Sequence, residues 1–121
     1  MSIPKVNLNE KFSTFNDHWQ PRIVGRLNGQ EVKLAKLKGE FVWHKHDEED
    51  EMFLVISGTL KMELEDKSLN LEEGEFVIIP KGTLHRPVAD EEVEVMLFEP
   101  AGTVNTGNAG GEFTRDEIEE I

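Results

Sequence analysis

Four side chains in this sequence are of the kinds that bind transition metals, and their spacing allows them to share one ion. They are His44, His46, Glu51 and His85. If residues 41–46 form a strand, the two-residue spacing of the first two histidines turns both imidazoles to the same face. The acidic run before Glu51 suits a turn, after which Glu51 begins the next strand and can return to that face. The sequence therefore predicts a metal site of three imidazoles and one carboxylate.

This donor set favours a divalent first-row transition metal: manganese, iron, cobalt, nickel, copper or zinc. Ions that prefer only oxygen ligands, such as calcium, fit it poorly. Four protein ligands around an octahedral ion leave two positions for water, substrate or dioxygen, which is the open site that catalysis needs. We expect one such ion per chain and leave its identity open.

Two other interpretations compete with this site. The paired histidines alone could be solvated residues of an edge strand, although the other two ligands, in register with glycine and proline turns, weaken that interpretation. The carboxylates of residues 47–50 compete with Glu51 as the fourth ligand. They belong to the turn by composition, so strand phase favours Glu51 and places Phe53 and Val55 on the same inward face.

The elements that must position these ligands are predicted to be short strands separated by turns. Asn28-Gly29 is a strong hairpin signal between two alternating segments. Alternating or continuous apolar segments recur along the chain, at residues 22–27, 31–37, 41–46, 51–56, 60–64, 69–71, 76–79 and 93–97. About eight short strands with regular turns predict an all-β sandwich or barrel, not a parallel α/β sheet.

Both ends of the chain carry helix signals. Residues 7–19 place apolar side chains at helical spacing, and Asn7 with Glu10 fits a cap and its partner, so we predict a short N-terminal helical segment. Near the other end, Thr114 and Glu117 form a capping box, which predicts a short C-terminal helix.

Length and composition indicate one soluble domain over residues 1–121, with a barrel core at about 21–100 and a glycine-rich tail at 101–121 that is either a mobile end or a lid over the barrel mouth. The 25 acidic and 13 basic residues give a formal net charge of −12, which argues against nucleic acid and anionic membranes as partners. No apolar run approaches the ~20 residues that span a bilayer. Since the chain has no cysteine and no secretory signal pattern, we expect a cytoplasmic protein.

The ligands and the turns around them resemble the paired motifs of the cupin superfamily. Eight positions carry the resemblance: His44, His46, Glu51, Gly58, Gly74, Pro80, Gly82 and His85. The short stretch between the two motifs is similar to that of small single-domain bacterial cupins of the cupin 2 conserved-barrel type. Two positions depart from the family pattern: Lys38 stands where glycine is usual, with Gly39 beside it, and Ala89 stands where asparagine is usual. We expect the offset glycine to produce a local bulge.

The resemblance implies a jelly-roll barrel (a double-stranded β-helix) with the metal near its centre, often in a homodimer. It does not fix the reaction, because this fold hosts dioxygenases, isomerases, decarboxylases, lyases and non-catalytic binders. We predict a small metalloenzyme that acts on a small organic substrate, either isomerase-like on a sugar derivative or dioxygenase-like. The alternative is a non-catalytic module that binds or senses a small molecule and holds a structural metal. A second inward acid or base would favour the enzyme, and purely aliphatic walls would favour the module.

The surroundings of the site leave two questions open. Five basic residues have an ambiguous strand phase and could bind an anionic substrate if they face inward: Arg22, Arg26, Lys33, Lys36 and Lys38. Arg86 should point away from the ligands. An inward His44 implies that Phe41 and Trp43 point outward, and we expect a homodimer interface to cover the tryptophan.

Overall fold

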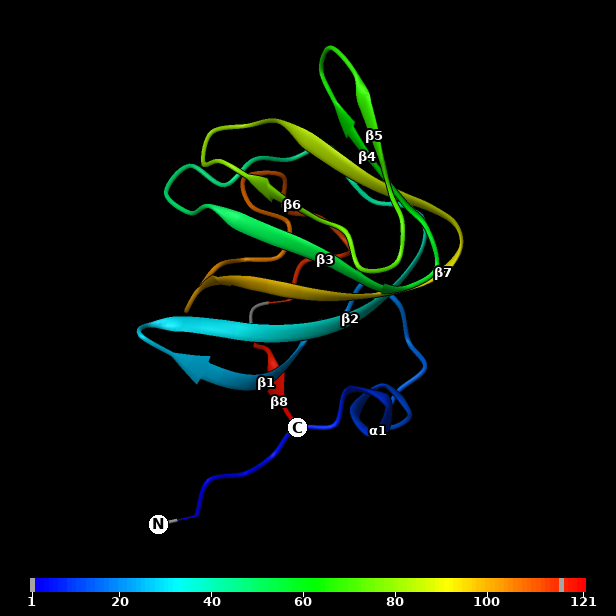
Figure 1. Cartoon of the computed structure of the whole chain (residues 1–121). Helices are drawn as coiled ribbons and strands as arrows, with labels where there is room; N and C mark the ends of the chain where they lie inside the picture. Colours follow the sequence, from blue (N-terminus) through cyan, green and yellow to red (C-terminus); the bar gives the residue numbers. More distant parts are fainter. Residues whose placement is uncertain (1, 116) are drawn as a thin grey trace.

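The computed structural model describes residues 2–115 and 117–121. These residues form a β-barrel with a short helix at its side (Figure 1). The helix is α1 (Leu8–Phe12), and the strands are β1 (Arg22–Leu27), β2 (Gln30–Glu40), β3 (Glu51–Ser57), β4 (Leu60–Leu64), β5 (Ser68–Leu71), β6 (Phe76–Ile79), β7 (His85–Pro100) and β8 (Glu119–Glu120). The predicted all-β barrel is confirmed.

The longest strand, β7, pairs with three other strands of the barrel. Its second half pairs with β2 on one side and β3 on the other, and its first half pairs with β4. Opposite the bend of β7, the register of β2 shifts between Leu37 and Gly39. Gly39 has φ +87°, a left-handed conformation that glycine adopts without a steric penalty. The bulge predicted from the offset glycine is therefore confirmed.

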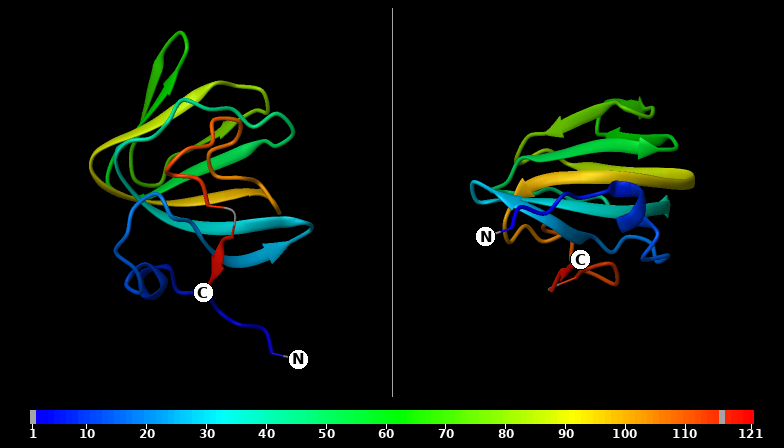
Figure 2. Two further views of the ribbon diagram at one scale, coloured as in Figure 1. Left: turned by 180° about the vertical axis from the view of Figure 1, so that it is seen from behind. Right: turned by 60° about the horizontal axis from the view of Figure 1, so that its bottom comes forward.

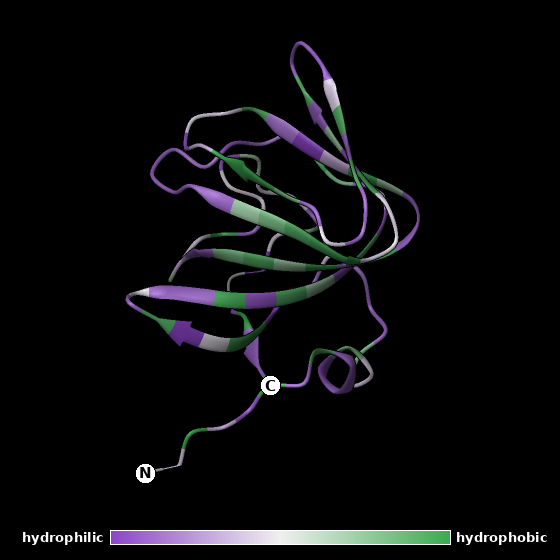
Figure 3. Cartoon of the chain, in the orientation of Figure 1, coloured by the Kyte–Doolittle hydropathy of each residue, from purple (hydrophilic) through white to green (hydrophobic). Residues whose placement is uncertain are grey.

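Alternating side chains of the strands fill the barrel. The middle of β3 and the second half of β7 are hydrophobic, whereas the turn that joins β1 to β2 is flanked by hydrophilic residues (Figure 3). Phe53 and Val55 are 4% and 0% exposed, so their predicted inward phase is confirmed. Burial of each such side chain contributes about 1.5–3 kcal/mol, which makes this interior the main stabilising element of the fold. A second cluster forms where Phe12 of α1 packs with Phe15 and Leu34 on the outer face of the sheet.

The N-terminal helix is shorter than predicted. It spans Leu8–Phe12, and the Asn7 side chain accepts a hydrogen bond from the backbone N–H of Glu10 at 3.0 Å, as the cap signal indicates. The remainder of residues 7–19 is irregular, because these residues fold over the sheet edge instead of continuing the helix. Trp19 ends this stretch in a left-handed conformation, φ +62°.

The prediction of a C-terminal helix is wrong. In the described part of the tail, Glu119–Glu120 forms β8, which pairs in parallel with Arg22 and Ile23 of β1. A helix of so few residues is marginal in water, whereas the edge of β1 offers unpaired backbone groups that the end of the chain can satisfy. No helix in the described part of the chain is long and apolar enough to cross a membrane.

The segment between β2 and β3 is not the regular strand that alternation predicts. Its pairing is a single bridge, in which His44 and His85 exchange backbone hydrogen bonds of 3.0 and 2.9 Å. Since residues 41–43 form no regular strand, alternation does not hold between Phe41 and His44: Phe41 is 7% exposed and stacks on Trp19 with ring centroids 4.6 Å apart. The prediction that Phe41 points outward is wrong, whereas Trp43 is 39% exposed as expected.

The tail after β7 lies across the barrel mouth and is not a free end (Figure 2). Asn108 makes two hydrogen bonds with Lys45: its side chain accepts from the Lys45 N–H at 2.9 Å, and its N–H donates to the Lys45 carbonyl at 3.1 Å. Phe113 packs against Phe41 with centroids 5.3 Å apart. The tail therefore holds the segment that carries two of the predicted metal ligands.

Candidate metal centre

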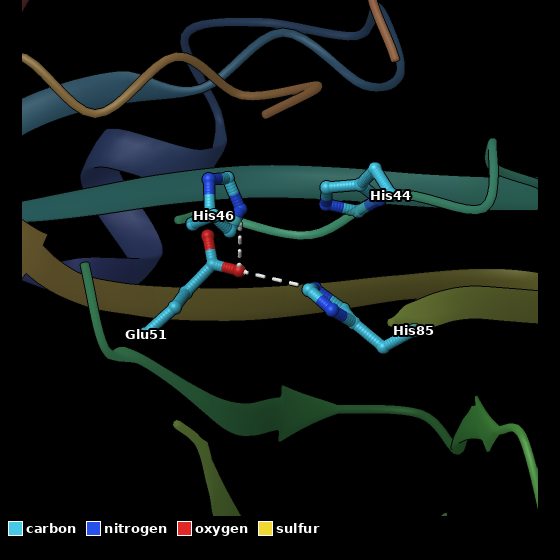
Figure 4. A group of neighbouring side chains, drawn as sticks. All are labelled: His44, His46, Glu51 and His85. Carbon is cyan, nitrogen blue, oxygen red and sulfur yellow. Dashed lines mark ion pairs between the residues drawn. The ribbon is translucent and has the colours of Figure 1, made fainter. Parts of the chain in front are cut away.

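The four predicted ligands converge inside the barrel (Figure 4). His44 and His46 come from the segment between β2 and β3, Glu51 opens β3 and His85 opens β7. One donor atom from each side chain lies within 4.8 Å of the other three. Glu51 Oε1 is 3.3 Å from His46 Nε2 and 3.5 Å from His85 Nε2. All four residues are buried, with exposures from 0% to 4%.

The atoms that face the centre of this cluster have no other partner. Nε2 of His46, Nε2 of His85 and Oε1 of Glu51 are buried without a hydrogen bond. A buried polar group left unpaired costs about 1–3 kcal/mol, so such a group is normally satisfied. Atoms that bind one ion at about 2.1 Å lie roughly 3–4 Å apart. The two distances from Glu51 Oε1 to the histidine nitrogens fall in that range, and the cluster is consistent with one metal ion.

Backbone carbonyls orient two of the three imidazoles. His44 Nδ1 is 2.9 Å from the Val42 oxygen, and His85 Nδ1 is 2.8 Å from the Thr83 oxygen. A proton on each Nδ1 donates to its carbonyl and leaves the Nε2 lone pair directed at the centre, which is the usual arrangement of histidine ligands. His46 has no such anchor.

Burial keeps the site ready for a cation. Burial first, and then the neighbouring His85, lower the pKa of His44 from 6.5 to about 4, so this imidazole is neutral at pH 7. Burial opposes ionisation of Glu51, but contacts with Glu99, His46 and His85 outweigh burial and hold the pKa of Glu51 well below its ordinary value. A neutral imidazole and a charged carboxylate are the forms that bind metal.

A second buried carboxyl lies behind Glu51. Glu99 is 1% exposed, and its Oε1 accepts a hydrogen bond from Lys33 Nζ at 2.8 Å. Burial, together with the negative charge of Glu51, raises the pKa of Glu99 well above its ordinary range, which favours the protonated form of this carboxyl. Its Oε2 has no other partner, and a proton on that atom can be donated to Glu51.

Sequence reasoning missed Glu99, although a signal was present. Val93, Val95 and Leu97 alternate into the barrel, and Glu99 continues the same phase on β7. Lys33 was one of the basic residues of uncertain phase. It faces inward, where its ammonium group donates a hydrogen bond to Glu99 and lies 3.7 Å from a carboxylate oxygen of Glu31.

An apolar hollow of about 30 Å³ adjoins the ligands, enough for about two water molecules. It is lined by His44, Glu51, Asn105 and eight apolar residues: Trp19, Pro21, Ala35, Leu37, Phe41, Phe53, Pro87 and Leu97. The Asn105 amide is already used by the tail, because its Nδ2 donates to the Phe113 carbonyl and its Oδ1 accepts from the Arg115 N–H. The polar groups free to act in this hollow are therefore the metal ligands themselves.

None of the five early basic residues lines this hollow. Arg86 also points away from the ligands, as predicted: its guanidinium binds Glu63 at 2.7 Å and lies over the Trp43 ring at 5.3 Å. The half-exposed tryptophan thus has a cover on its own chain.

The sequence matches the cupin domain family over residues 30–99, which include all four ligands. The chain belongs to the cupin family. The resemblance noted from the two motifs is confirmed, and the buried cluster is where this cupin would hold its ion.

Similar proteins support this membership over most of the chain. A cupin-2 domain containing protein from Shewanella frigidimarina is 47% identical, with a TM-score of 0.78 over 78% of this chain and 93% of that chain. A protein from Neisseria meningitidis is 29% identical, with a TM-score of 0.74 over 81% of this chain and 100% of that chain. YdbB of Bacillus subtilis is 39% identical over 64 residues, which are 52% of this cupin and 57% of YdbB. The cupin thus spans a little over half the length of this curated relative.

Proposed function

We propose that this cupin holds one divalent first-row transition metal on His44, His46, Glu51 and His85 and uses it to act on a small organic molecule. The observation that carries the proposal is the set of unpaired ligand atoms next to an apolar hollow. When bound, the ion would supply Lewis-acid polarisation of a carbonyl or hydroxyl oxygen, or a binding position for dioxygen.

The hollow as it stands holds about two water molecules, so an organic substrate has to push its walls apart, and these walls favour an uncharged, largely apolar substrate. No lysine or arginine lies among the residues that line it, and the Lys33 ammonium group already binds Glu31 and Glu99. A buried anionic or polyhydroxylated group needs partners that these walls do not offer. Dioxygenase-like chemistry on an apolar molecule therefore fits better than isomerisation of a sugar derivative.

The chain's own residues would contribute exclusion of water and a proton. Trp19, Phe41 and Phe53 shield the hollow, which strengthens electrostatic interactions inside it. The raised pKa of Glu99 favours a proton on this carboxyl beside Glu51, and that proton would help to orient the ligand. Glu99 is the second inward acid that an enzyme would use, and it acts through Glu51 because it does not itself line the hollow.

The alternative is a non-catalytic module that binds or senses a small molecule with the metal as anchor. One observation favours it: the hollow contains no acid or base other than the ligands, among the residues that line it. Both functions require the metal and a bound small molecule, but only the enzyme converts that molecule to a product.

Metal analysis tests the shared part of the proposal. We expect about one transition-metal ion per purified chain, and loss of that ion in the His44→Ala, His85→Ala double variant. His18→Ala is the matched control, because His18 lies on the surface and pairs with Glu92. A double variant that kept its metal would show that the ligands are wrong.

Cobalt-loaded protein tests the substrate class, since added ligands change the cobalt absorption spectrum. Three probes share one metal-binding nitrogen: 4-methylpyridine, 4-pyridinemethanol and isonicotinate. We expect 4-methylpyridine to bind best. Because 4-pyridinemethanol is polar but uncharged, its affinity reports the polarity of the walls without the repulsion that the protein's negative charge exerts on isonicotinate. Equal or tighter binding of the alcohol and isonicotinate would contradict the apolar assignment. Oxygen uptake by iron-loaded protein with neutral carbonyl and phenolic compounds then distinguishes the enzyme from the binding module.

We also propose a homodimer. Phe76 and Ile78 on β6 are 59% and 54% exposed, next to the apolar outer side chains of β3. Exposed apolar patches of this kind are typical of interfaces. Size exclusion with light scattering should give twice the 13.8 kDa chain mass, and a Phe76→Lys, Ile78→Lys variant should be monomeric. A monomeric wild-type protein would overturn this proposal.

A further inference from the structure

A second hollow, of very different composition, adjoins the metal cluster at His46. Its volume is about 250 Å³, and it is lined by Lys45, His46, Asp47, Glu48, Glu49, Gly102, Val104, Gly107 and Asn108. His44 and Glu51 line the apolar hollow, whereas His46 lines this one. The cluster is thus reached from two surfaces.

His46 differs from the other two histidines in a way that matters here. It is 4% exposed, yet neither of its ring nitrogens has a hydrogen-bond partner. His44 and His85 are anchored through Nδ1 to backbone carbonyls. His46 is therefore, of the three histidines, the one whose ring orientation no hydrogen bond fixes.

The charges around this hollow favour a cation. Asp47, Glu48 and Glu49 face one ammonium group, that of Lys45, which pairs with Asp47 at 3.6 Å. Among the described residues, the other two carboxylates have no cationic partner. A hydrated divalent ion would lose little solvation in such a site, whereas the aromatic walls of the other hollow would strip its water without replacing it.

We propose that the acidic hollow is the metal-uptake site of this cupin, in which residues 47–49 attract the hydrated divalent cation and His46 is the first ligand to bind it. The ion then passes to Glu51 and His85. Glu51 Oε1 lies 3.3 Å from His46 Nε2 and 3.5 Å from His85 Nε2. This inference rests on the proposed metal function, and it concerns the route of the ion and not its final ligands.

Stopped-flow uptake of Co²⁺ by the metal-free protein tests the acidic residues. The Asp47→Asn, Glu48→Gln, Glu49→Gln variant should bind Co²⁺ about tenfold more slowly at low ionic strength, with a weaker dependence on salt. The final cobalt spectrum should be unchanged, because the ligand set is intact. The matched control is Glu65→Gln, Asp66→Asn, Asp90→Asn, which changes the net charge equally at three exposed positions.

The control variant shows whether residues 47–49 or the net charge of the whole protein attracts the Co²⁺ ion. If both triple variants slow uptake equally, the general charge of −12 is responsible and the uptake site is wrong. Unchanged uptake in the 47–49 variant would also overturn it. If the wild-type protein binds no Co²⁺ at equilibrium, the proposed metal function itself fails, which is a different result.

Two single variants test the order of ligands. His46→Ala should lower the association rate of Co²⁺, since it removes the first ligand. His85→Ala should chiefly raise the dissociation rate, because His85 binds after the ion has entered. An association rate that is unaffected by His46→Ala would contradict the route.

Discussion

The two hollows that meet at the metal cluster have opposite chemistry. The apolar hollow is walled by aromatic and aliphatic side chains, and its free polar groups are His44 and Glu51. The acidic hollow is walled by a polar loop and the tail, with His46 at its base. The difference suggests a division of labour, in which one side receives an organic ligand and the other receives the cation.

The two hollows also differ in what they contribute to folding. Trp19, Phe41 and Phe53 belong to the main hydrophobic core, so the apolar hollow is part of what stabilises the barrel. Asp47 and Glu48 are exposed. The loop that carries them is held by hydrogen bonds to the tail at Lys45 and by hydrogen bonds from the N–H groups of Lys81 and Gly82 to Asp50 and His46. Substitutions on the two sides should therefore have effects of very different size.

The largest effect is expected in the apolar wall. Trp19→Ala should lower the free energy of unfolding by about 3–5 kcal/mol, because it opens a cavity in the core and removes the stack on Phe41. Urea unfolding followed by circular dichroism measures this. Trp43→Ala is the control: that side chain is half exposed, and its loss should cost about 1 kcal/mol. Equal losses would show that the apolar hollow is not part of the stabilising core.

Acid should destabilise the metal-free protein through the ligand that faces the apolar hollow. The pKa of His44 falls from 6.5 to about 4 on folding, so the unfolded chain binds more protons between these values. The contribution of His44 to the free energy of unfolding is fully present above pH 6.5. It is lost as the pH falls towards 4, and the loss amounts to about 3 kcal/mol. Unfolding free energies measured from pH 7 to 4 should show a shallower slope in His44→Leu. The same slope in both proteins would contradict this assignment.

A smaller effect is expected where the tail closes the acidic hollow. Gly107 has φ +53°, and an added Cβ would lie 2.2 Å from the Lys45 carbonyl oxygen. Gly107→Ala should cost about 2 kcal/mol and expose the tail to proteases, because the tail must lift from the loop. Gly110→Ala has a similar φ of +64° but meets nothing within 4 Å, and should cost about 1 kcal/mol. No difference between the two variants would show that the Lys45 contact does not hold the tail.

The smallest effect is expected in the acidic loop itself. Neutralising residues 47–49 should change the free energy of unfolding by less than about 0.5 kcal/mol, since these side chains pack against little. Thermal unfolding of the metal-free variant measures this. A large loss would mean that the loop stabilises the fold and would complicate its proposed role in metal uptake.

The sequence alone was sufficient for the fold class and for the convergence of the four candidate ligands. Alternation of apolar residues, the Asn28-Gly29 turn and the spacing of His44, His46, Glu51 and His85 are local features, and each has one simple structural solution. Alternation on β7 also contained Glu99, which could have been found by extending the phase of Leu97 by two residues.

The tertiary structure decided what local patterns leave open. Residues 41–43 lie outside any regular strand, so Phe41 does not follow the alternation expected from His44, and pairing with β1 replaced the C-terminal helix by β8. The partners of Lys33 and the position of the tail over the barrel mouth depend on residues far apart in the chain. Sequence thus determined which side chains meet at the metal cluster, because strand periodicity fixes their direction. Only the packing of distant segments decided what surrounds them, because burial and ion pairing depend on which segments come together.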